Sequence, residues 1–365
     1  MLYRVIGVMS GSSLDGLDLA FVELEDKGGK WSFSILETAC YAYDNEWMAK
    51  LKSAAHLNAL NFVELDALYG HFLGNQINKF IAEKKLDYKV GLIASHGHTV
   101  FHSPGKFSVQ IGHGASIAAE TDLPVVSDLR ALDVALGGQG APIVPMGEHL
   151  LFPETKFFLN LGGIANLSFN GSTFYDAFDI CAANRVLNML VNENGLAYDD
   201  NGSLSAKGRI DETLLETLNK LPYYQEEYPK SLENEFGTNI VYPLVVSSGL
   251  SIEDKLATYV EHIATQIAVA VEKIVVKRGL VVQSEKIMVT GGGAFNGYLI
   301  SRIEKHLSPL NIEISIPDPS IIVYKEALIM ALLGVLRWRE EETVFGSVTG
   351  ARRASVGGAL WMGQS

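Results

Sequence analysis

The chain has little cysteine and little positive charge. Its 365 residues include only two cysteines, Cys40 and Cys181, too few for a disulfide framework or a cysteine zinc site. We interpret both as small apolar residues of a protein in a reducing compartment. Lys and Arg number 29 against 42 Asp and Glu, a net charge of -13, so the chain lacks the positive surface that binds nucleic acid or anionic membranes. We expect a small-molecule ligand and no nucleic-acid partner.

Long apolar runs are also absent. The most apolar stretch, residues 327–336, is about half of the roughly 20 residues that a membrane-spanning helix needs. A Ser-Gly-Ser-Ser turn at residues 10–13 interrupts the region where a signal peptide would require continuous apolar sequence. The sequence therefore predicts a cytoplasmic protein with no membrane partner.

Glycine, by contrast, is abundant, with 35 residues, and the chain opens two halves in the same way. In the first half, apolar segments 3–9 and 17–24 flank a polar, glycine-containing turn, which indicates a β-hairpin. In the second half, segments 156–160 and 167–169 flank a Leu-Gly-Gly turn in the same arrangement. The two halves are predicted to be distant duplicates.

Strands and helices alternate through both halves, which predicts an α/β fold. A later strand in each half runs into small residues, 90–94 before Ser-His-Gly and 286–290 before three glycines. Apolar periodicity predicts helices over 61–85, 182–191, 251–277 and 324–341. We place the domain boundary in the turn-rich segment 137–142. This gives an N-terminal domain of residues 1–135 and a C-terminal domain of 136–365, whose final helix is free to pack back on the first domain.

Three glycine turns carry the functional prediction: residues 9–16, 161–166 and 290–296. Consecutive backbone N–H groups in such turns form anion sites, and glycine lets a phosphate approach closely. None of the three matches a Walker A motif or an early GxGxxG, and each one alone is most simply an ordinary turn. Their matching positions in two duplicated halves favour a nucleotide bound in an interdomain cleft.

Acidic residues beside these turns suggest the remaining chemistry. Asp15 and Asp18 adjoin the first turn, where a carboxylate can orient waters on Mg²⁺, although turn capping explains Asp15 nearly as well. Asp179 lies between apolar residues, so a partly desolvated general base is one interpretation. An N-cap for the helix predicted over 182–191 is an equally good one.

Four histidines lie close together in the sequence, at positions 96, 98, 102 and 113. Metal binding has to be considered, but no carboxylate lies between His96 and His113. Hydrogen bonding to a substrate, or packing, is favoured over a catalytic metal.

Taken together, seven segments carry a resemblance that runs nearly end to end: 7–18, 95–102, 124–130, 137–142, 160–168, 290–297 and 347–353. With these segments the chain resembles the anhydro-N-acetylmuramic acid kinase family, which belongs to the sugar kinase, Hsp70 and actin superfamily. The resemblance implies two ribonuclease H-like domains of the actin or hexokinase type. It also implies a reaction in peptidoglycan recycling, in which water opens a 1,6-anhydro sugar and ATP phosphorylates the released 6-oxygen.

The resemblance implies roles for particular residues, with ATP and Mg²⁺ as cofactors and an amino sugar as substrate. Asp179 would be the catalytic base, and Asp15 would hold Mg²⁺ through water. His96, Arg130, Asp133 and Glu326 would lie near the substrate. The nucleotide would be bound by Gly11, Ser12, Ser13, Leu14, Asp15, Gly16, Leu17, Asp18, Gly162, Gly163, Gly291, Gly292 and Gly293.

The sequence departs from the family pattern in two loops. Residues 179–184 read Asp-Ile-Cys-Ala-Ala-Asn where the family typically has Asp-Thr-Gly-Pro-Gly-Asn, and the Pro229 segment lacks an arginine that the family carries after Pro-Lys-Ser. His98 and His113 stand where the family tends to have Gln and Asp. An alternative is therefore a divergent nucleotide-binding relative with a changed sugar substrate or without catalysis. An actin-like or Hsp70-like ATPase is a third interpretation, and a homodimer is left open.

Overall fold

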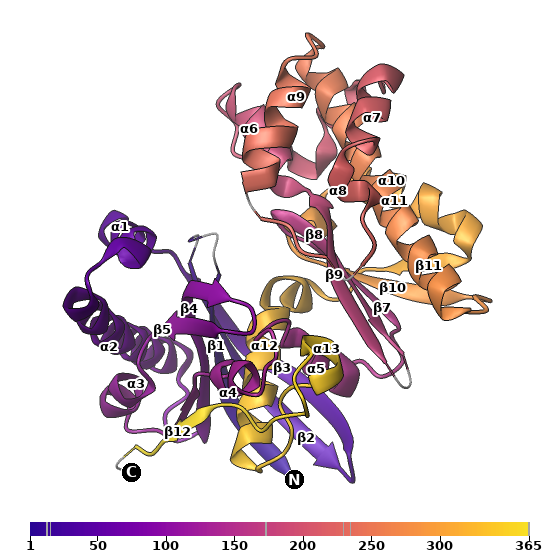
Figure 1. The fold of residues 1–365 in the computed structure, drawn as a ribbon. Helices are drawn as coiled ribbons and strands as arrows, with labels where there is room; N and C mark the ends of the chain where they lie inside the picture. Colours follow the sequence, from indigo (N-terminus) through magenta and orange to yellow (C-terminus); the bar gives the residue numbers. More distant parts are fainter. Residues whose placement is uncertain (12–13, 15, 172–173, 229, 234, 364–365) are drawn as a thin grey trace. The chain divides into compact units, whose positions relative to one another are not determined.

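The computed structural model describes residues 1–11, 14, 16–171, 174–228, 230–233 and 235–363. The chain forms two compact units, one of Met1–Pro153 with Tyr324–Ser365 and the other of Glu154–Val323 (Figure 1). The sequence placed a single division at residue 136. In the structure the first unit continues through helix α5 (Val144–Leu151), because Met146 and Leu151 are buried in the core of that unit.

The first unit contains a seven-stranded mixed sheet in the order β12-β6-β4-β1-β2-β3, with β5 paired to β4. Strands β1, β2 and β3 are antiparallel neighbours, whereas β4 runs parallel to both β1 and β6. The strands are β1 (Leu2–Ser10), β2 (Leu17–Lys27), β3 (Lys30–Tyr41), β4 (Leu92–Ser103), β5 (Phe107–Ile111), β6 (Val125–Ser127) and β12 (Ala359–Trp361).

The second unit contains a five-stranded sheet in the order β11-β10-β7-β8-β9. Its first three strands in the chain are again antiparallel neighbours, and β10 is again parallel to the strands on either side. This order repeats the β6-β4-β1-β2-β3 part of the first sheet, so the predicted duplicated α/β fold is confirmed. The strands are β7 (Phe157–Leu161), β8 (Ile164–Asn170), β9 (Tyr175–Ala182), β10 (Glu285–Thr290) and β11 (Ile312–Ser315).

The helices cover the sheets and begin and end at expected signals. Asn58 caps α2 by accepting from Asn61 N–H, and Ser251 caps α10 by accepting from Asp254 N–H. Helix α10 ends at Gly279, whose φ of 59° suits glycine. Besides α12 (Pro319–Trp338), the described helices of the first unit are α1 (Asn45–Ser53), the 3₁₀-helix η1 (Ala54–His56), α2 (Ala59–Lys84), α3 (Gly114–Thr121), α4 (Ala131–Ala135), α5 and α13 (Gly346–Thr349). Those of the second unit are α6 (Asn184–Asn192), the 3₁₀-helices η2 (Asp200–Gly202) and η3 (Ser205–Lys207), α7 (Glu212–Asn219), α8 (Pro222–Gln225), the π-helix η4 (Phe236–Val241), α9 (Tyr242–Val246), α10 (Ile252–Arg278), the 3₁₀-helix η5 (Gly292–Phe295), α11 (Gly297–Leu307) and the 3₁₀-helix η6 (Ser308–Leu310).

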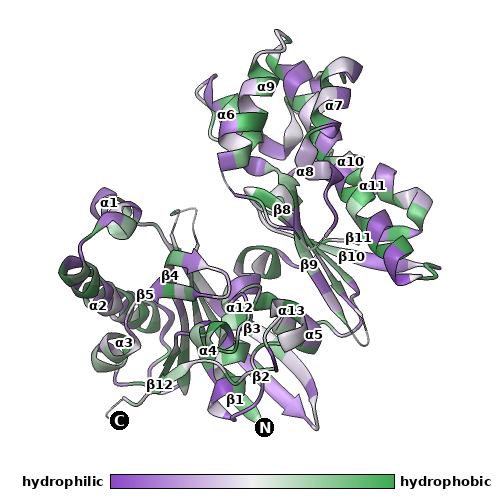
Figure 2. Ribbon diagram, in the orientation of Figure 1, coloured by the Kyte–Doolittle hydropathy of each residue, from purple (hydrophilic) through white to green (hydrophobic). Residues whose placement is uncertain are grey.

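Helix α12 is strongly apolar (Figure 2), and its buried side chains from Ala327 to Leu336 belong to the core of the first unit. Its length and composition alone would suit a membrane span, but 67% of its most apolar window is buried inside the protein. A Cβ at Gly7 of β1 would lie 1.8 Å from Ala327 O, so glycine is what lets β1 and α12 approach. The helix begins five residues earlier than predicted, with a kink at Tyr324.

One strand is longer than the sequence indicated. The prediction ended a strand at residue 94, before a turn at Ser95-His96-Gly97, whereas β4 continues to Ser103. Strand β5 pairs with this extension from His98 to Ser103 and satisfies its backbone hydrogen bonds. The predicted turn is therefore wrong, because the partner strand lies later in the sequence.

Candidate active site

The described part of the turn between β1 and β2 contains one left-handed residue, Leu14, and one tightly packed glycine, Gly16. Leu14 has a φ of 58°, a left-handed conformation that a leucine rarely adopts, and its N–H lies 3.4 Å from Gly11 O. A Cβ at Gly16 would lie 2.7 Å from Cys40 Sγ, so packing requires glycine there. Leu17 is buried in the core and Asp18 lies on β2, while Ser12, Ser13 and Asp15, predicted to bind phosphate or magnesium, lie outside the described residues.

A buried hydrogen-bond network lies directly before this turn. Ser10, the last residue of β1, accepts a hydrogen bond from Tyr43 OH at 2.8 Å, and its Oγ lies 3.0 Å from His98 Nδ1. Tyr43 OH in turn lies 2.6 Å from Tyr69 OH. Burial lowers the pKa of His98 to about 4, so the imidazole is neutral at physiological pH. The network fixes the carboxyl end of β1, from which the turn starts.

Arg130, which is partly buried, and His96, which is buried, form a hydrogen-bonded pair in the first unit. Arg130 Nε donates to His96 Nε2 at 2.9 Å, and Arg130 Nη1 donates to Gly140 O at 2.7 Å. His96 Nε2 must therefore carry the lone pair, which leaves the proton on Nδ1 to donate to Gly97 O at 3.0 Å. Burial and the Arg130 charge lower the pKa of His96 to about 3. His96 thus orients the guanidinium as a neutral acceptor.

Asp133 serves the loop that precedes α5. Its Oδ2 accepts from Gly140 N–H at 2.8 Å and its Oδ1 accepts from Thr349 Oγ1 at 2.6 Å. A Cβ at Gly138 would lie 2.3 Å from Asp133 Oδ2, so the carboxylate also requires glycine at that position. Both carboxylate oxygens hold the loop, and the side chain is 1% exposed. In this geometry Asp133 supports Arg130 through Gly140.

Glu326 lies on α12 near a buried ion pair. Lys325 Nζ donates to Glu148 Oε1 at 2.8 Å, with the two side chains 6% and 2% exposed. Burial raises the pKa of Glu326, and the charges of Lys325 and Arg130 oppose that increase. The first unit therefore places the buried Glu326 where the charges of Arg130 and of this ion pair act on it.

Asp179 lies in strand β9 of the second unit. Its Oδ2 accepts from Leu232 N–H at 2.9 Å, and within the described part of the chain no hydrogen bond is formed by its Oδ1. Burial raises the pKa of Asp179, while the Leu232 N–H opposes the shift. The N-cap of α6 is Ala183, so the alternative of Asp179 as a helix cap is wrong. One oxygen is held in place and the other is available, as a general base requires.

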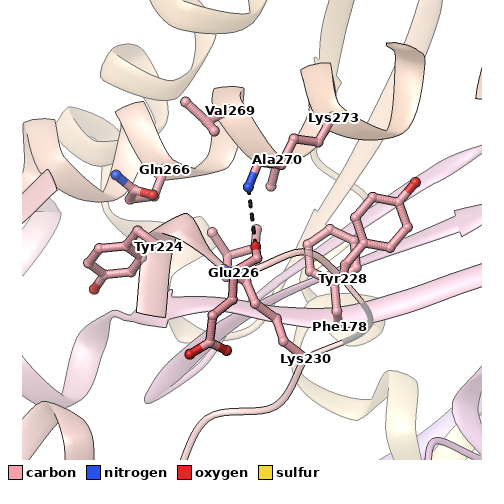
Figure 3. A pocket seen from close by; sticks show the side chains of 10 residues that line it. Phe178, Tyr224, Glu226, Tyr228, Lys230, Gln266, Val269, Ala270 and Lys273 are labelled. Carbon is pink, nitrogen blue, oxygen red and sulfur yellow. Dashed lines mark hydrogen bonds between the residues drawn. The ribbon is translucent and has the colours of Figure 1, made fainter. Parts of the chain in front are cut away.

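A small pocket lies on the α10 side of β9, beside the segment of residues 226–232 that contacts Asp179 (Figure 3). Phe178 and Ile180 line this pocket, and because strand side chains alternate, Asp179 between them belongs to the opposite face. The Phe178 ring stacks on Tyr228 at 4.6 Å, and Lys273 Nζ donates to Glu226 O at 3.2 Å. These contacts fix residues 226–228, and Asp179 N–H donates to Lys230 O a few residues later.

The loop that departs from the family pattern is well packed. Ile180, Cys181 and Ala182 complete β9 and are 2%, 0% and 1% exposed. Burial raises the pKa of the Cys181 thiol, so Cys181 acts as a small apolar residue. Helix α6 then begins at Asn184, whose Nδ2 donates to Leu161 O at 2.8 Å.

The glycine turns of the second unit fall into two kinds. A Cβ at Gly291 or Gly293 would lie 2.5–2.6 Å from atoms of Asn160 or Leu161, so packing requires these glycines. Cβ atoms at Gly162, Gly163 and Gly292 would have no neighbour closer than 3.4 Å. Neither packing nor backbone conformation explains the latter three, which leaves room for a ligand to approach the backbone.

The predicted histidine cluster does not form a metal site. His96 and His98 bond to Arg130 and Ser10, His102 Nδ1 lies 3.2 Å from Ser108 Oγ, and His113 precedes α3 with its ring 5.1 Å from Trp361. Among the described residues no three His, Cys, Asp or Glu side chains gather as metal ligands.

Sequence reasoning missed Ser10, Tyr43 and Tyr69 as parts of the site. Ser10 lies within the first glycine motif, which is the only available signal. The tyrosines come from the segment after β3 and from α2, and nothing in their local sequence links them to β1.

Comparisons with known proteins agree along the whole chain. A family model described as anhydro-N-acetylmuramic acid kinase matches residues 3–363. A protein of that name from Sulfurimonas denitrificans is 32% identical over 375 residues, covering 98% of this chain and 98% of the relative. One from Sulfurovum sp. is 32% identical over 98% of this chain and 99% of the relative, and one from Aliivibrio fischeri is 33% identical over 83% and 84%.

Proposed function

Because the chain belongs to the anhydro-N-acetylmuramic acid kinase family, we propose that it converts 1,6-anhydro-N-acetylmuramic acid, water and ATP to N-acetylmuramic acid 6-phosphate and ADP. The observation that carries the proposal is the match over residues 3–363. The reaction belongs to peptidoglycan recycling, which we place in the cytoplasm. The rival interpretations, a non-catalytic relative and an assembly ATPase, gain no support from the matches.

In this reaction Asp179 removes a proton from the attacking water. The water oxygen bonds to the anomeric carbon, the bond from that carbon to the 6-oxygen breaks, and the 6-oxygen bonds to the γ-phosphorus as ADP leaves. Leu232 N–H holds Asp179 Oδ2, so the carboxylate can present Oδ1 to the water. Burial raises the pKa of Asp179, which strengthens it as a base.

The first turn, from Gly11 to Asp18, is proposed to hold the ATP phosphates, and Gly291 to Gly293 to lie toward the nucleoside. Mg²⁺ usually takes one or two protein carboxylates and keeps water and substrate phosphates as its other ligands. Asp18 lies on β2, directly after this turn, and carries a carboxylate of the kind that Mg²⁺ takes. Asp18, with Asp15, would hold the ion, which when bound neutralises charge on the β- and γ-phosphates.

His96 and Asp133 are proposed to position Arg130 for the substrate. His96 accepts a hydrogen bond from Arg130 directly, and Asp133 holds Gly140, whose carbonyl accepts a second one. Glu326 is proposed to lie at the substrate as well.

The test measures ADP release with and without the anhydro sugar, together with mass spectrometry of the sugar product. In heavy-oxygen water the label should enter at the anomeric carbon and not at the phosphate. ADP release that does not depend on the sugar, or a product without a 6-phosphate, would overturn the proposal.

A further inference from the structure

Arg185 lies at the edge of the second sheet where ligands bind in α/β folds. Strands β7 and β10 are parallel neighbours, and their carboxyl ends are Leu161 and Thr290. Crevices at such ends are the usual ligand sites of these sheets. Arg185, in the first turn of α6, donates its backbone N–H to Gly163 O at 3.3 Å, directly beyond the end of β7.

The Arg185 side chain follows a defined path from that turn. The Cβ position of Gly163 would be 3.7 Å from Arg185 Cβ, and that of Gly237 would be 3.6 Å from Arg185 Cδ. Gly237 belongs to the π-helix η4. This helix type is rare in proteins, and where it occurs it is often at a functional site. The segment leading into η4 includes Leu232, which holds Asp179. The aliphatic part of the Arg185 side chain thus runs from the turn at Gly163 toward η4.

Arg185 lacks the partners that a partly buried guanidinium normally has. Its Nε is buried without a hydrogen-bond partner, and no salt bridge to a carboxylate is found for it among the described residues. Leaving a buried charged donor unpaired is costly. By contrast, Arg278 and Arg302 of the same unit pair with Asp176 and Glu261 at 2.5 and 2.6 Å.

The surface around Arg185 is open to a ligand. Gly163 and Gly292 have nothing within 4 Å of a Cβ position except, respectively, Arg185 Cβ and Asn184 Nδ2. Glycine is not needed there for packing, so the turn offers backbone N–H and an adjacent guanidinium without steric obstruction. An anionic oxygen suits both kinds of donor.

We propose that Arg185 binds an anionic oxygen of a substrate, either a phosphate oxygen of the nucleotide or the lactyl carboxylate of the sugar. This role rests on the proposed function and adds a specificity residue to it. Arg185 gives the planar, two-pronged recognition of phosphate or carboxylate that a lysine cannot reproduce.

The experiment compares wild type with Arg185→Met, using titration calorimetry with ADP and with the anhydro sugar separately. Losing a charged hydrogen bond should weaken one ligand by about tenfold to hundredfold. If Arg185→Met binds ADP more weakly than wild type does, the ligand group of Arg185 is a nucleotide phosphate. If the variant binds the anhydro sugar more weakly, but binds 1,6-anhydro-N-acetylglucosamine, which lacks the lactyl group, as wild type does, the ligand group is the lactyl carboxylate.

The control is Arg209→Met, which removes an exposed arginine of the same unit and should bind both ligands as wild type does. Unchanged binding of both ligands by Arg185→Met would overturn the inference. If that variant does not fold, Arg185→Gln removes the charge while keeping a polar end group, and the same criteria apply. Failure of the proposed function is separate: it would appear as wild-type protein without sugar-dependent turnover, whatever Arg185 binds.

Discussion

The buried ion pair Lys325–Glu148 allows a quantitative prediction for the core beside Arg130 and Glu326. The two charged groups lie 2.8 Å apart, and their side chains are 6% and 2% exposed. Lys325→Met leaves the Glu148 carboxylate in the core near Glu326, a second acid whose pKa is raised first by burial and further by the Glu148 charge. Removing one partner of a buried pair costs about 3–5 kcal/mol.

That loss should be visible in thermal unfolding of the first unit. In a domain of 150–250 residues each kcal/mol shifts Tm by roughly 2–4 °C, so Lys325→Met should lower Tm by about 6–20 °C. The matched control is Lys27→Met, because Lys27 also lies 2.8 Å from a glutamate, Glu25, but with the two side chains 72% and 37% exposed. An exposed pair contributes little, so this variant should keep the wild-type Tm.

A second substitution separates the loss of the ion pair from the cost of the carboxylate that is left buried. Glu148→Leu in the Lys325→Met background removes the remaining buried carboxylate of the pair and should recover part of the lost stability. Differential scanning calorimetry of the four proteins measures each value. The reasoning fails if Lys325→Met unfolds at the same temperature as Lys27→Met, or if the double variant is no more stable than Lys325→Met alone.

Three further predictions concern the site. Asp179→Asn should lower kcat by about 10²–10⁴-fold without unfolding the protein. Because the folded-state pKa of Asp179 is raised above 3.8, wild-type kcat/KM should fall as the pH drops through that raised value. The same fall in kcat/KM at acidic pH in the variant would contradict this role. His98→Leu removes the acceptor of the buried Ser10 hydroxyl proton and should cost about 1–3 kcal/mol in urea unfolding, whereas His98→Gln, which keeps an acceptor, should cost less. Gly163→Ala should keep the wild-type Tm but raise the KM for ATP, while Gly293→Ala, whose Cβ would lie 2.6 Å from Leu161 Cβ, should lower Tm; equal effects on Tm would refute the distinction.

Local patterns predicted most of the fold. Each hairpin is encoded by two apolar segments with a short polar turn, and α2 and α10 carry side-chain caps at Asn58 and Ser251. The extension of β4 could not be found this way, because its hydrogen bonds are made with β5, a separate strand. The same limit explains the open choice at Asp179: the pairing of Ile164 with Ala182 carries β9 past residue 179, and only then does α6 begin.

The site was predictable where a motif lies in one segment and hidden where several elements meet. The glycine turns stand out in the sequence, but whether packing or a ligand explains each glycine depends on distant atoms, such as Leu161 beside Gly293. The Ser10 network combines β1, β4, α2 and the segment after β3, so no spacing rule could join its members.

A chain with a net charge of -13 must bind anionic substrates through local donors. Several of its arginines are paired with carboxylates, as Arg278 is with Asp176 and Arg339 with Asp26. Arg130 and Arg185 differ, since neither forms a salt bridge with a described carboxylate, and each comes from a different unit. Arg130 follows the carboxyl end of β6 and Arg185 lies beyond that of β7, so each sheet places one such guanidinium where its fold binds ligands. Within the proposed function, Arg130 and Arg185 are therefore the guanidinium groups that we expect to bind anionic oxygens, because both substrates, ATP and a muramic acid, are anions.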